Sequence, residues 1–370
     1  MLIFDVLFYS FIVVILIQII FYLIVFGQFS FNKNDNRKGS SVPISILICA
    51  KNEAKNLKKH LPLIFDQDYP NFEVILINDG SSDKTLKVME SFKKIHSNVK
   101  IVNVKNIEAF WGNKKYALTL GIKAATHSHL LFTDADCKPL SKNWIKEISS
   151  HFNNSTSIVI GYGAYQKIPK SFINKLIRFE TLLTAVQYFS YAKTGMPYMA
   201  VGRNLAYTKD IFFEARGFMN HMKIKSGDDD LFVNEIATSS NTQICFTKDS
   251  FTESLPKQTY SDWILQKRRH LSTAVHYKFK HKLLLSLFYF SQLSFLVISI
   301  VLLSFLFYWK LILGLILFRY IIIFVVLIAA SKKLNEKDLI PYLPLLELFL
   351  IISQLSIFIK NLTLKPGHWK

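Results

Sequence analysis

Two aspartates stand where a divalent metal could be held. Asp134 and Asp136 are separated by one residue and directly follow the apolar run of residues 129–133. Hard cations such as Mg²⁺ and Mn²⁺ prefer oxygen ligands and often share their coordination shell with substrate phosphates. The pair is therefore a candidate metal site for a phosphorylated substrate. The alternative interpretation is an acidic turn after a strand, which needs no ligand.

Two further acidic segments could bind or activate a substrate. Asp79 lies in the segment Asn-Asp-Gly-Ser-Ser-Asp, and could hydrogen-bond a base or a ribose. The same segment also suits a turn followed by a helix cap. Asp228, Asp229 and Asp230 are consecutive. Crowding raises the pKa of a carboxyl group, which suits one of them as a general base, whereas the alternative is an acidic first turn of a helix.

Basic residues gather before the apolar region that begins at residue 283. Gln266 and Arg269 belong to the segment Gln-Lys-Arg-Arg-His, where the guanidinium of Arg269 could clamp a diphosphate. The alternative is that this segment, like the three lysines of residues 278–282, contacts anionic lipid headgroups. The ten histidines and three cysteines show no zinc-ligand spacing, and the sequence contains no P-loop.

Apolar runs and helical periodicity alternate between residues 42 and 281. Short β-branched runs indicate buried strands, and most are followed by a segment with helical spacing. This order predicts an α/β fold with a mostly parallel sheet covered on both faces, in which ligands bind beyond the carboxyl ends of the strands. Asp79 and the pair Asp134 and Asp136 stand at those ends. The expected strands are residues 44–50, 72–77, 99–104 and 129–133, and the expected helices are residues 53–65, 83–96 and 114–125.

The rest of the chain is apolar and bordered by basic residues. Of the 370 residues, 51% are hydrophobic, and the formal net charge is +19. This composition excludes a disordered chain and is unusual for a soluble enzyme. Residues 2–26 are long enough to span a bilayer and are predicted to be a retained anchor, and residues 283–330 suit two helices that turn near residues 308–310. Residues 340–359 could span the membrane or lie in its interface.

The basic flank of the first apolar segment predicts the orientation. Lys33, Arg37 and Lys38 follow that segment, and the positive-inside rule places such a flank in the cytoplasm. The three cysteines form no disulfide framework, which agrees with a reducing compartment. The predicted division of the chain is residues 1–27 as an anchor, residues 42–275 as a folded domain, and residues 283–360 as transmembrane or interfacial helices.

Taken in order, these motifs resemble family 2 glycosyltransferases, the inverting group that includes hyaluronan and cellulose synthases. The similarity covers roughly residues 42–270. Each motif alone is common, and their joint order and spacing carry the resemblance. The matching segments are Ala50-Lys-Asn-Glu53, Asp79, Gly112-Asn-Lys114-Lys-Tyr-Ala117-Leu118, Asp134-Ala-Asp136, Gly202-Arg-Asn204, Asp229, and Gln266 with Arg269.

The resemblance implies a GT-A fold and a role for each matching residue. Asp229 would be the catalytic base that deprotonates the acceptor hydroxyl. Asp134 and Asp136 would hold Mg²⁺ or Mn²⁺ on the diphosphate. The nucleotide sugar would contact Glu53, Asp79, Lys114, Asp134 and Arg269, with Asp79 at the uracil, and the acceptor side would include Gly202, Asn204 and Gln266.

The implied protein is a membrane-bound, hexosyltransferase-like enzyme of envelope glycan synthesis. It would move a sugar from a nucleotide-diphosphate donor, UDP-linked by preference, to a hydroxyl group of a lipid or glycan. It would cross the cell (inner or plasma) membrane several times, with its catalytic domain in the cytoplasm, and would contact membrane lipids but no nucleic acid. The alternative is a catalytically inactive membrane scaffold that binds sugar nucleotides. A transporter is disfavoured because the apolar segments carry no ladder of charges.

Three positions depart from the family pattern. Asn78 replaces the first aspartate of Asp-Asp-Gly, Asn113 is inserted between Gly112 and Lys114, and His270 stands where a tryptophan completes Gln-x-x-Arg-Trp. In the family that tryptophan helps to hold the acceptor end of a growing polymer. Its replacement leaves the transfer of a single sugar as an alternative to processive synthesis.

Overall fold

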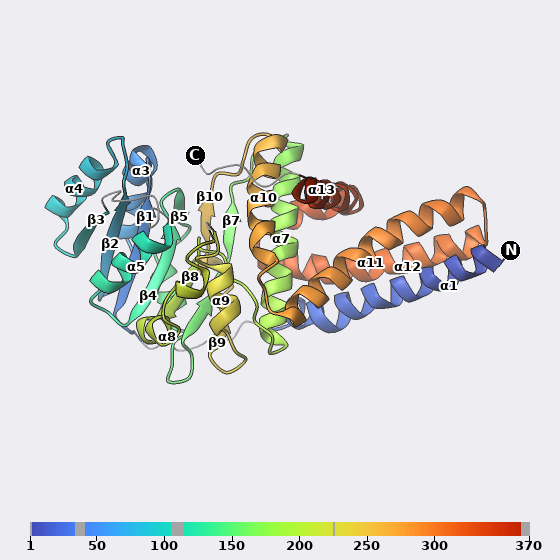
Figure 1. Cartoon of the computed structure of the whole chain (residues 1–370), viewed down its shortest axis with the longest axis horizontal. Coiled ribbons are helices and arrows are strands. Elements are labelled where there is room, and N and C mark those ends of the chain that lie inside the picture. The colour runs from blue at the N-terminus through green and yellow to red at the C-terminus, as the bar shows by residue number, and fades with distance from the viewer. Residues whose placement is uncertain (1, 34–40, 105–113, 225, 364–370) are drawn as a thin grey trace. The chain divides into compact units, whose positions relative to one another are not determined.

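The computed structural model describes residues 2–33, 41–104, 114–224 and 226–363, and it divides into two compact units (Figure 1). The α/β unit consists of Asn34–Lys170 and Gly195–Gln258. The helical unit consists of Met1–Lys33, Ser171–Thr194 and Thr259–Lys370.

Strands and helices alternate through the first half of the α/β unit, as the sequence predicts. Short strands and helices make up its second half. The elements are β1 (Ile44–Ala50), α3 (Ala54–Phe65), β2 (Phe72–Asp79), α4 (Thr85–Ile95), β3 (Val99–Val104), α5 (Lys114–Ala124), β4 (His129–Asp134), β5 (Cys137–Pro139), α6 (Trp144–Ser149), β6 (Ile158–Ile160), β7 (Gly163–Tyr165), β8 (Leu205–Thr208), α8 (Lys209–Glu214), η2 (Met219–His221), α9 (Asp230–Ile236), β9 (Thr242–Ile244), η3 (Lys248–Ser250) and β10 (Thr252–Ser254).

A mostly parallel sheet forms the centre of the α/β unit. Its seven strands lie in the order β3-β2-β1-β4-β8-β6-β9. Strand β1 pairs in parallel with β2 and β4, and β2 pairs in parallel with β3, whereas β8 runs antiparallel to β4 and β6. The strands β1, β2 and β4 are almost wholly buried, which explains their nearly continuous apolar sequences. The predicted α/β fold with a mostly parallel sheet is therefore confirmed.

Helices pack against both faces of this sheet. On one face, Gly121 of α5 leaves room for Ile77 of β2, because a Cβ at position 121 would lie 2.2 Å from Cδ1 of Ile77. On the other face, Leu57 of α3 and Met89 of α4 join the apolar core formed by alternate residues of β1 and β2. The sheet is thereby covered on both faces, and its strand ends carry the segments that follow them.

A second, smaller sheet was not evident from the sequence. It contains the strands β5, β10 and β7 in that order. Ser254 of β10 lies opposite Cys137 of β5 on one side and opposite Tyr165 of β7 on the other. Because Cys137 directly follows Asp136, this sheet extends from the candidate metal ligands.

The helical unit consists of long helices with apolar sequences. Its elements are α1 (Leu2–Ile19), the π-helix η1 (Ile20–Phe26), α2 (Gly27–Ser30), α7 (Phe172–Lys193), α10 (Tyr260–Ala274), α11 (Phe279–Ser304), α12 (Trp309–Lys333), η4 (Lys337–Tyr342) and α13 (Leu343–Thr363).

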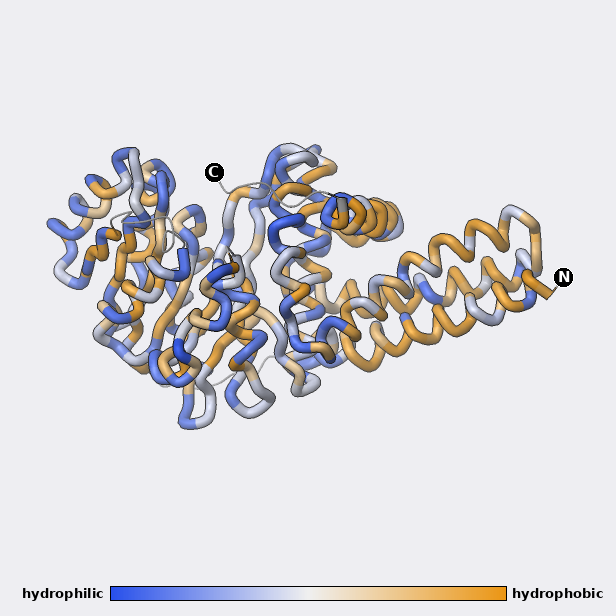
Figure 2. Tube along the Cα trace, in the orientation of Figure 1, coloured by the Kyte–Doolittle hydropathy of each residue, from blue (hydrophilic) through white to orange (hydrophobic). Residues whose placement is uncertain are grey.

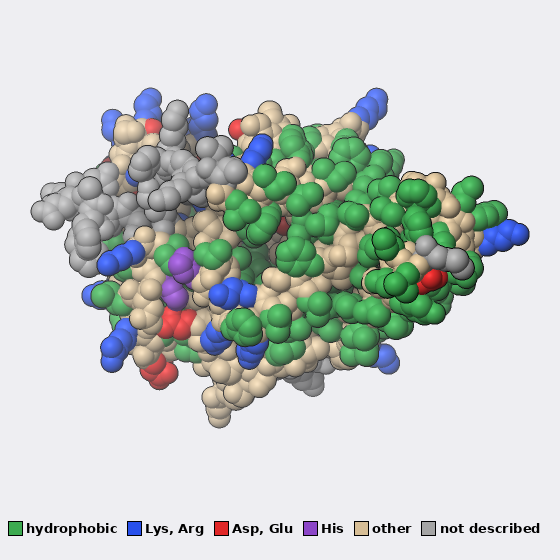
Figure 3. All heavy atoms as spheres, turned by 45° about the vertical axis from the view of Figure 1, so that its right-hand side comes forward, with side chains coloured by type: hydrophobic (Ala, Val, Ile, Leu, Met, Phe, Trp, Pro, Cys, Tyr) green, Lys and Arg blue, Asp and Glu red, His purple; other side chains and the backbone are tan. Residues whose placement is uncertain are grey.

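Four stretches of the described chain are long and apolar enough to cross a membrane: Leu2–Ser30, Phe279–Ser304, Trp309–Lys333 and Lys337–Leu362. The last of them contains the segment for which the sequence left both a span and an interfacial position open. Figure 2 shows the apolar residues running along α1, α11 and α12, and Figure 3 shows a broad surface of exposed apolar side chains. These helices indicate that the protein associates with a membrane.

Helices α7 and α10 pack with the apolar helices. Ser190 of α7 donates a hydrogen bond to the carbonyl oxygen of Phe26 (3.4 Å), and Tyr260 of α10 is 2.9 Å from the hydroxyl of Ser353. The sequence predicts one folded domain over residues 42–275, whereas α7 and α10, both within that range, belong to the helical unit. The limits of the folded domain stay a prediction.

Gly112, Asn113, Arg37 and Lys38 lie outside the described residues.

Candidate active site

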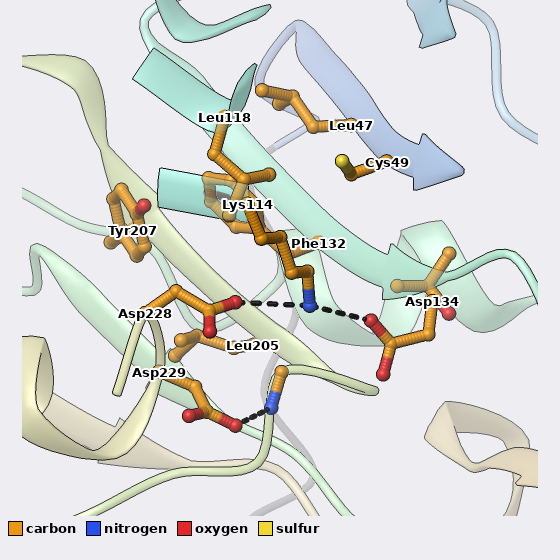
Figure 4. Close-up of a pocket in the computed structure, with 12 residues that line it drawn as sticks. Leu47, Cys49, Lys114, Leu118, Phe132, Asp134, Leu205, Tyr207, Asp228 and Asp229 are labelled. Carbon is orange, nitrogen blue, oxygen red and sulfur yellow. Dashed lines mark hydrogen bonds and ion pairs between the residues drawn. The ribbon is translucent and has the colours of Figure 1, made fainter. Parts of the chain in front are cut away.

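A pocket lies at the carboxyl end of the parallel strands (Figure 4). The strand register places Cys49 of β1 beside Asp134 of β4, so the segments that follow these strands meet at one edge of the sheet. Cys49 and Tyr207 contribute to the wall of the pocket, and its charged residues are Lys114, Asp134, Asp228 and Asp229. Three of the acidic and basic motifs predicted from the sequence therefore meet in one place.

Lys114 connects two of these motifs. Its Nζ lies 2.9 Å from Oδ1 of Asp134 and 3.0 Å from Oδ2 of Asp228 (Figure 4). Burial alone would lower the pKa of Lys114, but the carboxylates of Asp134 and Asp228 raise it well above its ordinary value. The side chain is therefore a permanent cation between the end of β4 and the start of α9.

Asp229 is held by two backbone amides. The N–H of Gly202 donates to its Oδ2 (2.6 Å), and the N–H of Asp230 donates to its Oδ1 (2.8 Å). A Cβ at position 202 would lie 3.2 Å from that Oδ2, so glycine permits the close approach. Asp229 is also the N-cap of α9. The acidic helix start considered as an alternative is thus present, and the same carboxylate faces the pocket.

The two neighbouring carboxyl groups have opposite pKa shifts. Burial, reinforced by the negative charges of Asp228 and Asp230, raises the pKa of Asp229 to about 7. Burial also favours a raised pKa for Asp228, but the cation of Lys114 overrides it and lowers that pKa. Asp228 therefore stays ionised, whereas Asp229 can accept and release a proton near neutral pH.

Asp134 and Asp136 form the candidate metal site. One ligand atom each from Asp134, Asp136 and Cys137 lie within 4.8 Å of one another. The thiol of Cys137 is buried and donates to Oδ1 of Asp136 (3.4 Å). Two carboxylates at this spacing are hard oxygen ligands, which suit Mg²⁺ or Mn²⁺. The residues present therefore fit a divalent cation.

Asp79 and Glu53 lie at the same edge of the sheet but, among the described residues, are not part of the pocket wall. Asp79 ends β2 and is 8% exposed, and burial raises its pKa. Oε2 of Glu53 accepts a hydrogen bond from Asn56 (2.6 Å), and its backbone N–H donates to Oγ1 of Thr85 (2.8 Å). The loops that follow β1 and β2 are thereby joined next to Asp79.

Gly202 and Asn204, both predicted to lie on the acceptor side, have different surroundings in the structure. Gly202 lines the pocket, but the side chain of Asn204 is fully buried. Its Oδ1 accepts from Nε1 of Trp144 (3.0 Å), and its Nδ2 donates to the carbonyl oxygens of Tyr162 (2.9 Å) and Ser250 (2.7 Å). These hydrogen bonds fix the chain after Gly202. Because they occupy the buried side chain of Asn204, it is not placed to contact an acceptor.

The remaining predicted residues, Gln266 and Arg269, lie on α10 in the helical unit.

Sequence patterns gave no role to Arg203, which stacks on the ring of Tyr165 with 4.2 Å between Cζ and the ring centroid. The available signal was its place inside the segment Gly-Arg-Asn. Its partners come from β7 and β10, which are too short to leave a periodic pattern.

Comparison with known proteins shows what this chain is similar to. The sequence model described as Glycosyl transferase family 2 matches residues 45–217. Glycosyltransferase AglE of Haloferax volcanii is 26% identical over 219 residues, which cover 57% of this chain and 66% of AglE. Poly-beta-1,6-N-acetyl-D-glucosamine synthase of Staphylococcus epidermidis is 39% identical over 93 residues, which cover 25% of this chain and 21% of the synthase. The chain thus matches between about a fifth and two thirds of the length of these relatives.

A solved structure shows the same fold. The mannosyltransferase PcManGT from Pyrobaculum calidifontis, in complex with GDP-Man and Mn²⁺, superposes with a TM-score of 0.57 at 16% sequence identity. The match covers 90% of this chain and 97% of PcManGT. Together with the family match, it confirms the predicted GT-A type of α/β fold.

Proposed function

Since the chain carries a glycosyl transferase family 2 domain, we propose that it is a membrane-anchored, inverting glycosyltransferase. It moves a sugar from a nucleotide-diphosphate donor, UDP-linked, to a hydroxyl group of a lipid or glycan in envelope glycan synthesis. The observation that carries the proposal is the position of Asp229 in the pocket with a pKa of about 7.

Asp229 acts as the general base of this reaction. The acceptor oxygen forms a bond to the anomeric carbon while the bond between that carbon and the diphosphate oxygen breaks. The acceptor proton passes to a carboxylate oxygen of Asp229, and the nucleoside diphosphate leaves with the bonding electrons. Attack opposite the leaving group inverts the anomeric carbon. A base whose pKa lies near the working pH is suited to this proton transfer.

The donor's diphosphate requires positive charge. Asp134 and Asp136 would hold Mg²⁺ or Mn²⁺, which would supply that charge to the leaving group when bound. Lys114 adds an ammonium on the same side, since its Nζ already lies 2.9 Å from Asp134. Asp79 and Glu53 face the nucleoside, and the family resemblance adds Arg269 as a diphosphate clamp.

The residues around Asp229 support a position for the acceptor next to this carboxylate. Gly202 borders the acceptor because its N–H bonds to the carboxylate of the base. Asn204 acts by positioning the chain behind it, and Gln266 is added by the family resemblance.

The cytoplasmic position of the reaction rests on the basic ends of the apolar helices. Nζ of Lys333 donates to the carbonyl oxygen of Phe29 (2.6 Å) and also to that of Asn32. The ends of α2 and α12 therefore lie together, and Lys33 and Lys332 belong to the same end of the helical unit. The positive-inside rule assigns this end to the cytoplasm.

A donor panel tests the proposal. Detergent-solubilised full-length protein is incubated with UDP-, GDP- and other nucleotide-linked sugars, and the released nucleoside diphosphate is measured. We expect release from a UDP-sugar that requires Mg²⁺ or Mn²⁺ and stops in EDTA. Asp136→Asn removes a ligand charge but little volume, so it should abolish release. Asp66→Asn, which changes an exposed carboxylate paired with Lys142, is the matched control and should keep full turnover.

Two results would contradict the proposal in different ways. Full turnover in EDTA, or in Asp136→Asn, would remove the metal from the mechanism. Binding of a nucleotide sugar without release of any nucleoside diphosphate would indicate an inactive scaffold.

A further inference from the structure

Among the described residues, hydrogen bonds hold the guanidinium group of Arg203 at one nitrogen, Nη1. Its plane stacks on the ring of Tyr165, 4.2 Å away, and Nη1 donates to the carbonyl oxygen of Ala164 (3.2 Å) and to Oγ of Ser254 (3.1 Å). Within residues 2–33, 41–104, 114–224 and 226–363, Nε and Nη2 have no hydrogen-bond partner. These two nitrogens form the opposite edge of the fork.

The guanidinium group of Arg203 lies beside the candidate metal ligands Asp134 and Asp136. Ser254 and Tyr165, which hold it, stand in one row of the small sheet with Cys137. Cys137 directly follows Asp136 in the chain, so the residues that hold the guanidinium belong to the row of the small sheet that begins next to that aspartate. The positive charge of Arg203 also interacts with the charges of Asp134 and Asp136.

Gly163 leaves the space that the side chain of Arg203 occupies. A Cβ at position 163 would lie 3.1 Å from Cβ, 3.2 Å from Nε and 3.3 Å from Cζ of Arg203. With glycine there, the arginine lies flat against β7. An arginine held by stacking and by two hydrogen bonds loses little further freedom when it binds an anion.

We propose that Arg203 binds a phosphate oxygen of the donor's diphosphate through Nε and Nη2. Two parallel N–H donors on a planar cation match the spacing of phosphate oxygens. The donor is favoured as the source of the anion because Asp134 and Asp136, the neighbours of Arg203, are the residues that would hold a metal on its diphosphate. This inference rests on the proposed function and adds to it a specific cation from the α/β unit.

The test compares a nucleotide that carries the diphosphate with one that lacks it. UDP and uridine are titrated calorimetrically into the detergent-solubilised full chain with Mn²⁺ present. Arg203→Gln should weaken UDP binding roughly tenfold or more, because charge-assisted hydrogen bonds to phosphate are lost, and should leave uridine binding within about twofold. Lys138→Gln is the matched control. It removes a cation of β5 whose Nζ lies 3.1 Å from Glu253, and it should leave both affinities unchanged.

Each other outcome counts for or against the inference. Unchanged UDP affinity in Arg203→Gln overturns it, and a raised acceptor KM in that variant would assign the anion to the acceptor instead. If Arg203→Gln also loses uridine, Arg203→Lys decides, because it keeps the charge without the fork: weakened UDP with retained uridine supports the inference, and full retention of both overturns it. Failure of the wild-type protein to bind UDP or GDP counts against the proposed function itself.

Discussion

Lys114 and Asp228 form an ion pair across the pocket, with 3.0 Å between Nζ and Oδ2. The pair joins the first residue of α5 to the residue before the proposed base. Because Lys114 keeps Asp228 ionised, Asp229 lies next to a fixed negative charge, and its own pKa is raised to about 7. The ion pair therefore prepares its neighbour to take up a proton.

Asp229→Asn should slow sugar transfer and leave donor binding nearly intact. The amide keeps the shape of the side chain but cannot accept the acceptor's proton. A positioned base contributes about 10²–10⁴-fold to a rate, so kcat should fall at least that far. The donor's affinity should change little, because the proposed donor contacts are Lys114, Asp79 and the metal ligands. Single-turnover transfer and UDP titration on the same preparation measure the two effects.

Asp228→Asn and Asp230→Asn are the controls for this substitution. Asp228→Asn breaks the ion pair with Lys114, so it should lower kcat and also change the affinity for UDP. Asp230→Asn should have the smallest effect, since Asp230 is buried and its Oδ1 accepts from the N–H of Leu231 (2.7 Å). If Asp228→Asn alone lost chemistry while keeping UDP affinity, the base would be Asp228. If none of the three slowed transfer, the carboxylates would only start a helix.

The pH dependence of kcat should show one acidic limb with a midpoint near 7. Below that pH, Asp229 is protonated and cannot act as a base, so the rate should fall about tenfold for each further pH unit. Above it, the rate should level off. Initial rates between pH 5 and 9 at saturating donor and acceptor measure the profile. A midpoint near 4, the ordinary value of an aspartate, would contradict the raised pKa.

The same raised pKa predicts how stability responds to pH. Between about pH 4 and 7 the unfolded chain has Asp229 ionised while the folded chain keeps it protonated, so the folded state binds more protons. Stability contributed by this group is therefore lost as the pH rises through that window. Asp229→Asn removes the loss, so its Tm relative to the wild type should be higher at pH 8 than at pH 5. An identical difference in Tm between the variant and the wild type at both pH values would contradict the raised pKa of Asp229.

Periodicity predicts the parallel half of the fold because long buried strands leave a strong pattern. The strands around Asp79 and Asp134 begin within their predicted limits, and both aspartates lie at the predicted edge. The expected helix of residues 83–96 begins later, at Thr85, because Oδ1 of Asp83 accepts from the N–H of Thr85 (2.9 Å) and caps it from outside. Local chemistry of this kind shifts a boundary without changing the fold.

Contacts between distant segments leave no such pattern. Neither the pairing of Lys114 with Asp228 nor the stacking of Arg203 on Tyr165 follows from spacing, because each depends on how short strands and helices fold back on the sheet. Asn204 illustrates the opposite difficulty. A polar residue in a motif looks functional in sequence, yet here it satisfies the buried indole of Trp144.

The proposed orientation predicts which engineered cysteines react in intact cells. Lys33 follows the first apolar segment, and Lys310 lies at the start of α12, near the opposite end of that helix from Lys333. A membrane-impermeant thiol reagent should label Lys310→Cys in intact cells and should label Lys33→Cys only after the membrane is permeabilised. The wild-type protein, with Cys49, Cys137 and Cys245, gives the background. Labelling of Lys33→Cys in intact cells would place the active site outside.

Arg319 and Glu347 join the apolar helices through a buried, two-point ion pair. Nη2 of Arg319 lies 2.6 Å from Oε1 of Glu347, and Nη1 lies 3.1 Å from Oε2. Gln18 accepts from Nε of Arg319, and Gln292 donates to Oε1 of Glu347 (3.5 Å). Each of α1, α11, α12 and α13 therefore contributes one residue to the cluster. In an apolar environment such a cluster fixes which helices associate, since a partner left alone is an unpaired buried charge.

Removing one partner of this pair should destabilise the helical unit more than removing both. Arg319→Met leaves the carboxylate of Glu347 buried without its cation, and such a loss costs about 3–5 kcal/mol. The double variant Arg319→Met with Glu347→Met replaces the pair by apolar side chains of similar size, so its Tm in detergent should lie above that of Arg319→Met. Lys332→Met, which alters an exposed cation at the end of α12, should keep the wild-type Tm. A double variant less stable than either single variant would show that the two residues act independently, and the association of the helices would then have to rest on their apolar packing alone.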